Sequence, residues 1–172
     1  MRALWTIALA ALAGPLAAHP HTSVDQQVHI AIGPEQAKVA IRIVPSAADG
    51  DVTRAVLDLD GNGVIDPAEA DVFRNTVIGA LSVTWSETAI VPINADIRIA
   101  PLEDLAAGLG TIELTADFPI NTPLRSLEIE MLYDGLGAEW FIQPFFFDGV
   151  FADNPPRITR FDDTNRIELD AV

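Results

Sequence analysis

The sequence predicts a mainly β domain of the α+β class, an antiparallel β-sandwich-like fold that carries one inserted helical segment. Apolar residues alternate with polar residues in many short runs, which is typical of strands that bury one face. Turn-forming residues separate these runs. The alternation stops between about residues 50 and 81, where apolar residues recur at helical spacing. We therefore expect one β-rich domain over residues 19–172, interrupted between its second and third strands.

The first two strands are expected to form a β-hairpin. Valine and isoleucine alternate with other residues over 28–32 and again over 39–43. Gly33 and Pro34 stand between the two runs, and both residues favour turns. Two alternating runs joined by a short turn indicate a hairpin.

The later strands follow the insertion, and one of them is unusually aromatic. Residues 140–147 read WFIQPFFF, which predicts a buried strand interrupted near Pro144, because proline cannot donate to a sheet ladder. If several of these rings are exposed, they mark a surface for a partner instead. The strands are expected at 81–85, 90–100, 111–118, 124–132, 140–147, 158–161 and 167–169.

The inserted segment contains two expected helices. A short helix is expected within residues 46–57. A longer amphipathic helix is expected over 67–81, because Ala70, Phe73 and Val77 recur at helical spacing. The residues between the two helices are predominantly acidic, amide or glycine residues, which makes this connection the strongest candidate for a binding site.

The connection Asp58–Glu69 reads DLDGNGVIDPAE and has the oxygen pattern of a calcium loop. Ca²⁺ prefers six to eight oxygen ligands, and a twelve-residue loop supplies them from positions 1, 3, 5, 7, 9 and 12. Position 6 is Gly63, where the chain must turn sharply. Position 8 is Ile65, which we expect to hold the loop against the core. The candidate calcium ligands are Asp58, Asp60, Asn62, the backbone carbonyl of Val64, Asp66 and Glu69.

This pattern resembles the EF-hand family over about residues 50–81. The resemblance implies a calcium ion bound by Glu69 through both carboxylate oxygens and by Asp66 through a water molecule. EF-hands usually occur in pairs, and this sequence has no second loop of the kind. A single loop favours a structural or weakly buffering site over a sensor that opens a groove.

An alternative explanation requires no metal. Asp66, Pro67 and Glu69 also form a good helix start, with Asp66 as the cap, Pro67 at the first position and Glu69 completing a capping box. This alternative explains the end of the loop. It does not explain why Asp58 and Asp60 stand so close to the other acidic residues.

Residues 1–18 have the layout of a secretory signal peptide. Arg2 precedes an apolar run over 3–13, and small residues at Ala17 and Ala18 suit a cleavage site. The run is too short to span a bilayer, and no later run is long enough either. We therefore expect a periplasmic or secreted protein without a transmembrane segment in the mature chain.

All three histidines of the chain lie near the expected mature terminus. They are His19, His21 and His29. A free amine and imidazole at His19 could chelate copper, nickel or zinc together with the other two side chains. The alternative is a frayed and solvated terminus.

The order of features also resembles uncharacterised bacterial periplasmic proteins that are associated with nickel- or cobalt-type permeases. The shared features are a His-Pro-His start, two strands, a calcium-type loop and further strands. The resemblance implies an accessory role in transition-metal transport, with a membrane permease as the partner. This is the alternative to a calcium-binding function.

Composition excludes several other classes. The formal net charge is −15, which disfavours nucleic acid and anionic membranes as partners, since both require clustered lysine and arginine. No cysteine is present, so disulfides and thiolate chemistry are excluded. No histidine follows His29, and no phosphate loop or dinucleotide fingerprint occurs. We expect a protein that is not an enzyme.

Overall fold

The chain folds into a mainly β structure, as the sequence predicts. The computed structural model describes residues 23–120, 122–147, 150–151, 154–161 and 163–171. The strands are β1 (Asp25–Ile32), β2 (Gln36–Val44), β3 (Leu81–Trp85), β4 (Thr88–Ala89), β5 (Ile93–Ile99), β6 (Ile112–Pro119), β7 (Ser126–Met131), β8 (Phe141–Phe146), β9 (Arg157–Phe161) and β10 (Arg166–Asp170). The helices are η1 (Ala47–Asp49, a 3-10 turn), α1 (Gly50–Leu57), α2 (Pro67–Gly79) and α3 (Leu102–Ala106).

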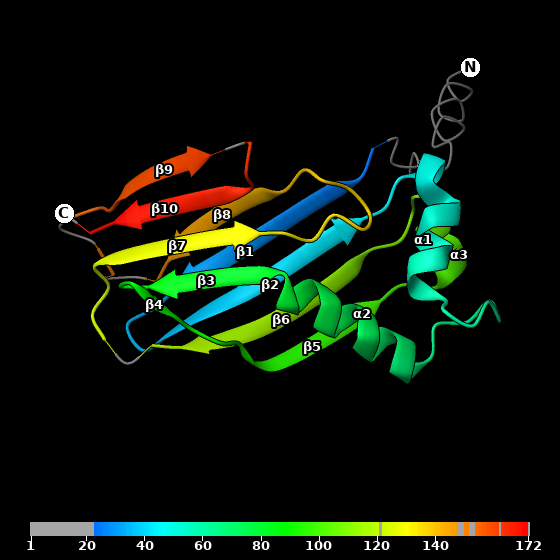
Figure 1. Ribbon diagram of the computed structural model, residues 1–172, viewed down its shortest axis with the longest axis horizontal. Coiled ribbons are helices and arrows are strands. Elements are labelled where there is room, and N and C mark those ends of the chain that lie inside the picture. The colour runs from blue at the N-terminus through cyan, green and yellow to red at the C-terminus, as the bar shows by residue number, and fades with distance from the viewer. Residues whose placement is uncertain (1–22, 121, 148–149, 152–153, 162, 172) are drawn as a thin grey trace, which may run out of the picture.

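The strands form two sheets that share one hydrophobic core (Figure 1). The first sheet has the order β5-β6-β2-β1-β8, and the second sheet has the order β4-β3-β7-β10-β9. The strand pairs are antiparallel except for β1 and β8, which run parallel. The antiparallel arrangement expected from the sequence is therefore confirmed for the other pairs and is wrong at this one pair. β8 follows β7 of the other sheet, so no tight hairpin requires it to run antiparallel to its neighbour.

The predicted β-hairpin is confirmed. β1 and β2 pair antiparallel from Asp25 opposite Val44 to Ile32 opposite Ala37. Alternate residues of both strands are buried, and the valines and isoleucines of the pattern face the core. Burying each such side chain contributes about 1.5–3 kcal/mol, so a register shift of one residue would turn the apolar face into water.

The aromatic strand β8 lies at an edge of the first sheet and is only half buried. Ile142 and Pro144 face inward, whereas Phe141 and Phe145 are about half exposed. The prediction of a buried strand is therefore wrong for its outer face. The strand is also continuous through Pro144, because an edge strand tolerates a proline whose nitrogen faces away from its neighbour.

The two predicted helices lie between β2 and β3, where the sequence indicates them. α2 buries Phe73, Val77 and Ile78 against the core. It ends at Gly79. Leu81, which the expected helix over 67–81 included, is instead the first residue of β3. The sequence does not predict α3, which lies beside α1 at one end of the sheets (Figure 1).

Candidate metal centre

The candidate loop connects the last turn of α1 to the first turn of α2. The N–H of Asp58 still donates to the carbonyl of Arg54 at 2.8 Å, so the first loop residue is tied to the preceding helix. Gly61 and Gly63 adopt positive φ angles of 73° and 85°. Glycine adopts this conformation at little cost, which explains why both positions of the sharp turn are glycine.

Three carboxylates of the loop gather at one place. One oxygen from each of Asp58, Asp60 and Glu69 lies within 4.8 Å of the others. Asp60 is exposed, Asp58 is partly buried, and Glu69 is buried with 7 % exposure. Three negative groups at this separation repel one another, so a bound cation would stabilise the arrangement. Oxygen ligands suit calcium, magnesium and manganese alike, so the three carboxylates alone do not specify the ion.

The first half of the loop wraps its backbone around the two aspartates. Asp58 accepts from the N–H groups of Asn62 at 3.0 Å and Gly63 at 2.8 Å. Asp60 accepts from the N–H of Asn62 at 3.0 Å and from its side-chain amide at 2.8 Å. The amide oxygen of Asn62 accepts from the N–H of Val64 at 2.8 Å. These bonds direct the aspartate carboxylates toward the inside of the turn.

Glu69 ties the two ends of the loop together. Its Oε1 accepts from the N–H of Leu59 at 2.6 Å and from the N–H of Asp60 at 3.2 Å. Its Oε2 accepts from the N–H of Asp66 at 2.9 Å. Hydrogen bonds to a charged acceptor contribute more than neutral ones. A single buried side chain therefore binds both the start of the loop and Asp66 at the start of α2.

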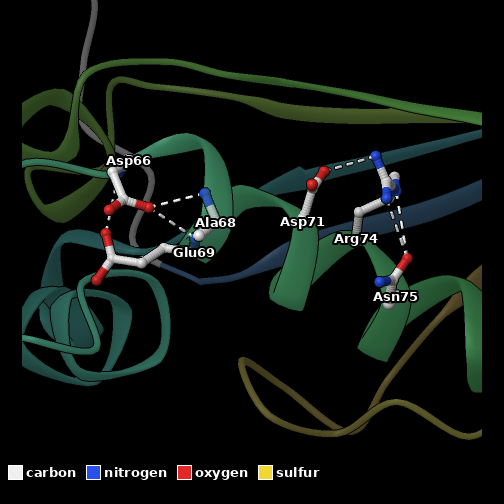
Figure 2. Close-up of polar contacts among 6 residues, drawn as sticks. All are labelled: Asp66, Ala68, Glu69, Asp71, Arg74 and Asn75. Carbon is white, nitrogen blue, oxygen red and sulfur yellow. Dashed lines mark hydrogen bonds and ion pairs between the residues drawn. The ribbon is translucent and has the colours of Figure 1, made fainter.

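Asp66 caps α2 and lies outside the carboxylate group. Its Oδ1 accepts from the N–H of Ala68 at 2.8 Å and the N–H of Glu69 at 2.9 Å (Figure 2). Together with the bond from Asp66 to Glu69, this forms a capping box, and Pro67 occupies the first helical turn. The alternative helix-start interpretation is therefore confirmed for Asp66. It does not compete with the carboxylate group, because Glu69 takes part in both.

The remaining candidate residues divide between loop surface and core. The side chain of Val64 is 64 % exposed. Ile65 is partly buried and packs against the core, as expected of a residue that holds the loop down.

On the next turns of α2, Arg74 forms an ion pair with Asp71 at 2.7 Å and a hydrogen bond with Asn75 (Figure 2).

Of the three histidines, the structure describes only His29. His29 lies on β1, where its ring meets the ring of Phe145 edge-on at a centroid distance of 5.5 Å. Within the described residues His29 belongs to no group of metal-ligating side chains. His19, His21 and the expected signal segment 1–18 lie outside the described residues.

No protein-family model matches the chain, and no curated protein sequence matches it. Among the described helices, none is long and apolar enough to cross a membrane.

One helix close to the loop, α3, was not expected from the sequence. α3 begins after Pro101 and carries Glu103 and Asp104 in its first turn. A proline followed by acidic residues is a recognised helix start, so the signal is present in the sequence. α3 matters because Gly50 of α1 packs on the carbonyl of Ala106, where an added β-carbon would lie only 2.5 Å from the oxygen.

Proposed function

We propose that the loop Asp58–Glu69 binds Ca²⁺ as a single EF-hand-type site. The observation that carries the proposal is the convergence of Asp58, Asp60 and Glu69 within 4.8 Å at loop positions 1, 3 and 12. A calcium loop requires carboxylates at these positions. The capping box alone would require only Glu69 and Asp66.

The remaining donors fit a hard cation. Asn62 and the carbonyl of Val64 would add oxygens at positions 5 and 7, and Asp66 would act through water at position 9. Every donor in this set is an oxygen, whereas zinc and copper sites prefer nitrogen and sulfur. The spacing of the donors over twelve residues is what favours calcium over other oxygen-seeking cations.

The ion would stabilise the fold by linking α1 to α2. The loop connects the end of α1 to the start of α2. α1 packs on α3, and α2 packs on β5. A ligand that binds only the folded state stabilises it by about 2.7 kcal/mol at a concentration one hundred times its Kd. Affinities of about 10⁻⁴ to 10⁻³ M are typical of extracellular calcium modules. A site of such weak affinity would have a structural or weakly buffering role.

Calorimetric titration of the purified protein with CaCl₂ tests the proposal. Asp60→Asn removes an exposed carboxylate charge without touching the bonds of Glu69, and we expect it to weaken Ca²⁺ binding by at least about tenfold. Asp71→Asn is the matched control, because it makes the same change on α2 outside the loop and should leave Ca²⁺ binding unchanged. Equal binding by the parent and Asp60→Asn would refute the site.

Titration with MgCl₂ distinguishes calcium from a general divalent site. Mg²⁺ requires near-octahedral geometry and dehydrates reluctantly, so a flexible loop with many carbonyl and carboxylate oxygens should bind it more weakly. Equal affinities for the two ions would contradict the assignment to calcium.

A further inference from the structure

An open groove lies beside the candidate loop, between the start of α2 and the end of β5. It has a volume of about 790 Å³. Its lining includes residues 63–67 of the loop, Ala70 of α2, Ile97 and Ile99 of β5, and residues 100–103 at the start of α3. We call it the β5 groove. Val64 and Asp66, which are proposed calcium donors, line this groove, whereas Asp58, Asp60 and Glu69 are not part of its lining.

The backbone of β5 presents unpaired groups toward its free edge. β5 is the outermost strand of the first sheet and, within the described part of the chain, pairs only with β6. Just beyond β5, the N–H of Ala100 donates to the carbonyl of Thr111, the residue before β6, at 3.1 Å. Because bonded positions alternate along an antiparallel pair, Ile97 and Ile99 direct their N–H and C=O groups away from β6. Among the described residues, the backbone groups of Ile97 and Ile99 form no backbone hydrogen bond outside the pairing of β5 with β6.

Only the second half of β5 offers a regular edge. The pairing with β6 shifts register between Ile93 and Asp96, and Asn94 has a positive φ of 54°. Such a bulge interrupts pairing and protects an edge strand. From Asp96 to Ile99 the register with β6 is regular, and this half contains both isoleucines that line the groove.

The groove combines apolar walls with an acidic rim. Ile97, Ile99 and Leu102 supply apolar surface on the side of β5 and α3. Asp66 and Glu103 place two carboxylates on the rim against the single guanidinium of Arg54. With a chain charge of −15, this balance favours a partner that carries basic residues.

We propose that the free edge of β5 binds an extended peptide segment of a partner protein as an added strand. Ile97 and Ile99 each offer one donor and one acceptor to such a segment, and strand addition draws its affinity from bonds of this kind. Alternate apolar side chains of the segment would enter the β5 groove, and a lysine or arginine would meet Asp66 and Glu103. The proposal does not depend on calcium binding.

Selection of a displayed random peptide library on the immobilised protein supplies the probe. Ile99→Pro removes the outward N–H of residue 99 without removing a bond to β6, and prolines are tolerated at such edge positions. Ile99→Val is the matched control, because it trims the side chain and keeps the N–H. We expect selected peptides to alternate apolar residues, to carry basic residues, and to lose at least about tenfold in affinity for Ile99→Pro but not for Ile99→Val.

Amide hydrogen exchange of the parent protein tests the same edge without a substitution. Binding of a selected peptide should slow exchange of the Ile97 and Ile99 amides, because both become hydrogen-bonded. The proposal is overturned if no peptide is enriched, or if selected peptides leave these two amides unprotected. A concentration-dependent dimer with both amides protected in the absence of peptide would assign the edge to a second copy of the chain instead.

Discussion

The buried carboxylate of Glu69 accepts a hydrogen bond from the backbone N–H of Leu59 at 2.6 Å, joining the start of α2 to the start of the loop. The same side chain also accepts from Asp60 and Asp66. Replacing it with alanine removes the charged acceptor of these three part-buried backbone hydrogen bonds. We expect Glu69→Ala to lower the free energy of unfolding by about 2–3 kcal/mol in the absence of divalent cations.

Urea unfolding in a chelating buffer measures this loss. Glu69→Gln keeps one oxygen acceptor, so its loss should be smaller than that of Glu69→Ala. Asp71→Ala is the control, since its exposed ion pair with Arg74 contributes no more than about 1 kcal/mol. If Glu69→Ala unfolds at the parent urea concentration, Glu69 does not hold the loop together.

The positive φ of Gly63 leads to a second prediction. A β-carbon at Gly63 would meet no atom within 4 Å, so the penalty for Gly63→Ala is conformational and not steric. We expect a loss of about 1–2 kcal/mol in thermal unfolding. Gly79→Ala is the matched control, because Gly79 ends α2 without a positive φ and is equally uncrowded. It should be neutral or slightly stabilising. Equal effects of the two substitutions would show that the loop conformation carries no strain.

Gly50 tests the packing of α1 on α3. Its added β-carbon would lie 2.5 Å from the carbonyl oxygen of Ala106, so the two helices would have to separate. We expect Gly50→Ala to destabilise the fold by about 1–3 kcal/mol, although alanine is the better helix former. Urea unfolding measures the stability of Gly50→Ala, with Gly79→Ala as the control. A stabilised Gly50→Ala protein would mean that α1 does not depend on its contact with α3.

The single tyrosine of the chain allows a direct pH measurement. Burial, aided by the negative charge of Asp134, raises the pKa of Tyr133 from 10.0 to about 12. The folded state therefore keeps this proton more tightly than the unfolded state. The contribution to stability is complete below pH 10 and is lost as the pH rises toward 12, at up to about 1.4 kcal/mol per pH unit.

Tyrosinate absorbance follows this titration, because no other tyrosine is present. Tyr133→Phe is the control for the stability measurement. The hydroxyl has no hydrogen-bond partner among the described residues, so its removal should be nearly neutral at pH 7 and should reduce the loss at high pH. A midpoint near pH 10 in the folded protein would contradict the buried environment of Tyr133.

Much of the fold could be predicted because its signals are local. The alternation over 28–32 and 39–43 predicted the hairpin, and α2 begins at Pro67, where the cap signals predicted its start. The grouping of Asp58 with Asp60 and Glu69 also follows from spacing along one short loop. The outer face of β8 was mispredicted, because aromatic composition does not reveal that a strand lies at a sheet edge.

The sequence by itself determined where most strands and the first two helices form, which faces of the hairpin strands are apolar, and which loop concentrates oxygen ligands. Those properties depend on residues close together in the chain, through side-chain periodicity and capping. Only the tertiary structure decided that β8 runs parallel to β1, that α3 packs on Gly50, and that the regular half of β5 is left as a free edge. These features depend on contacts between distant segments, where the burial of a whole face selects the neighbour and leaves no local sequence signal.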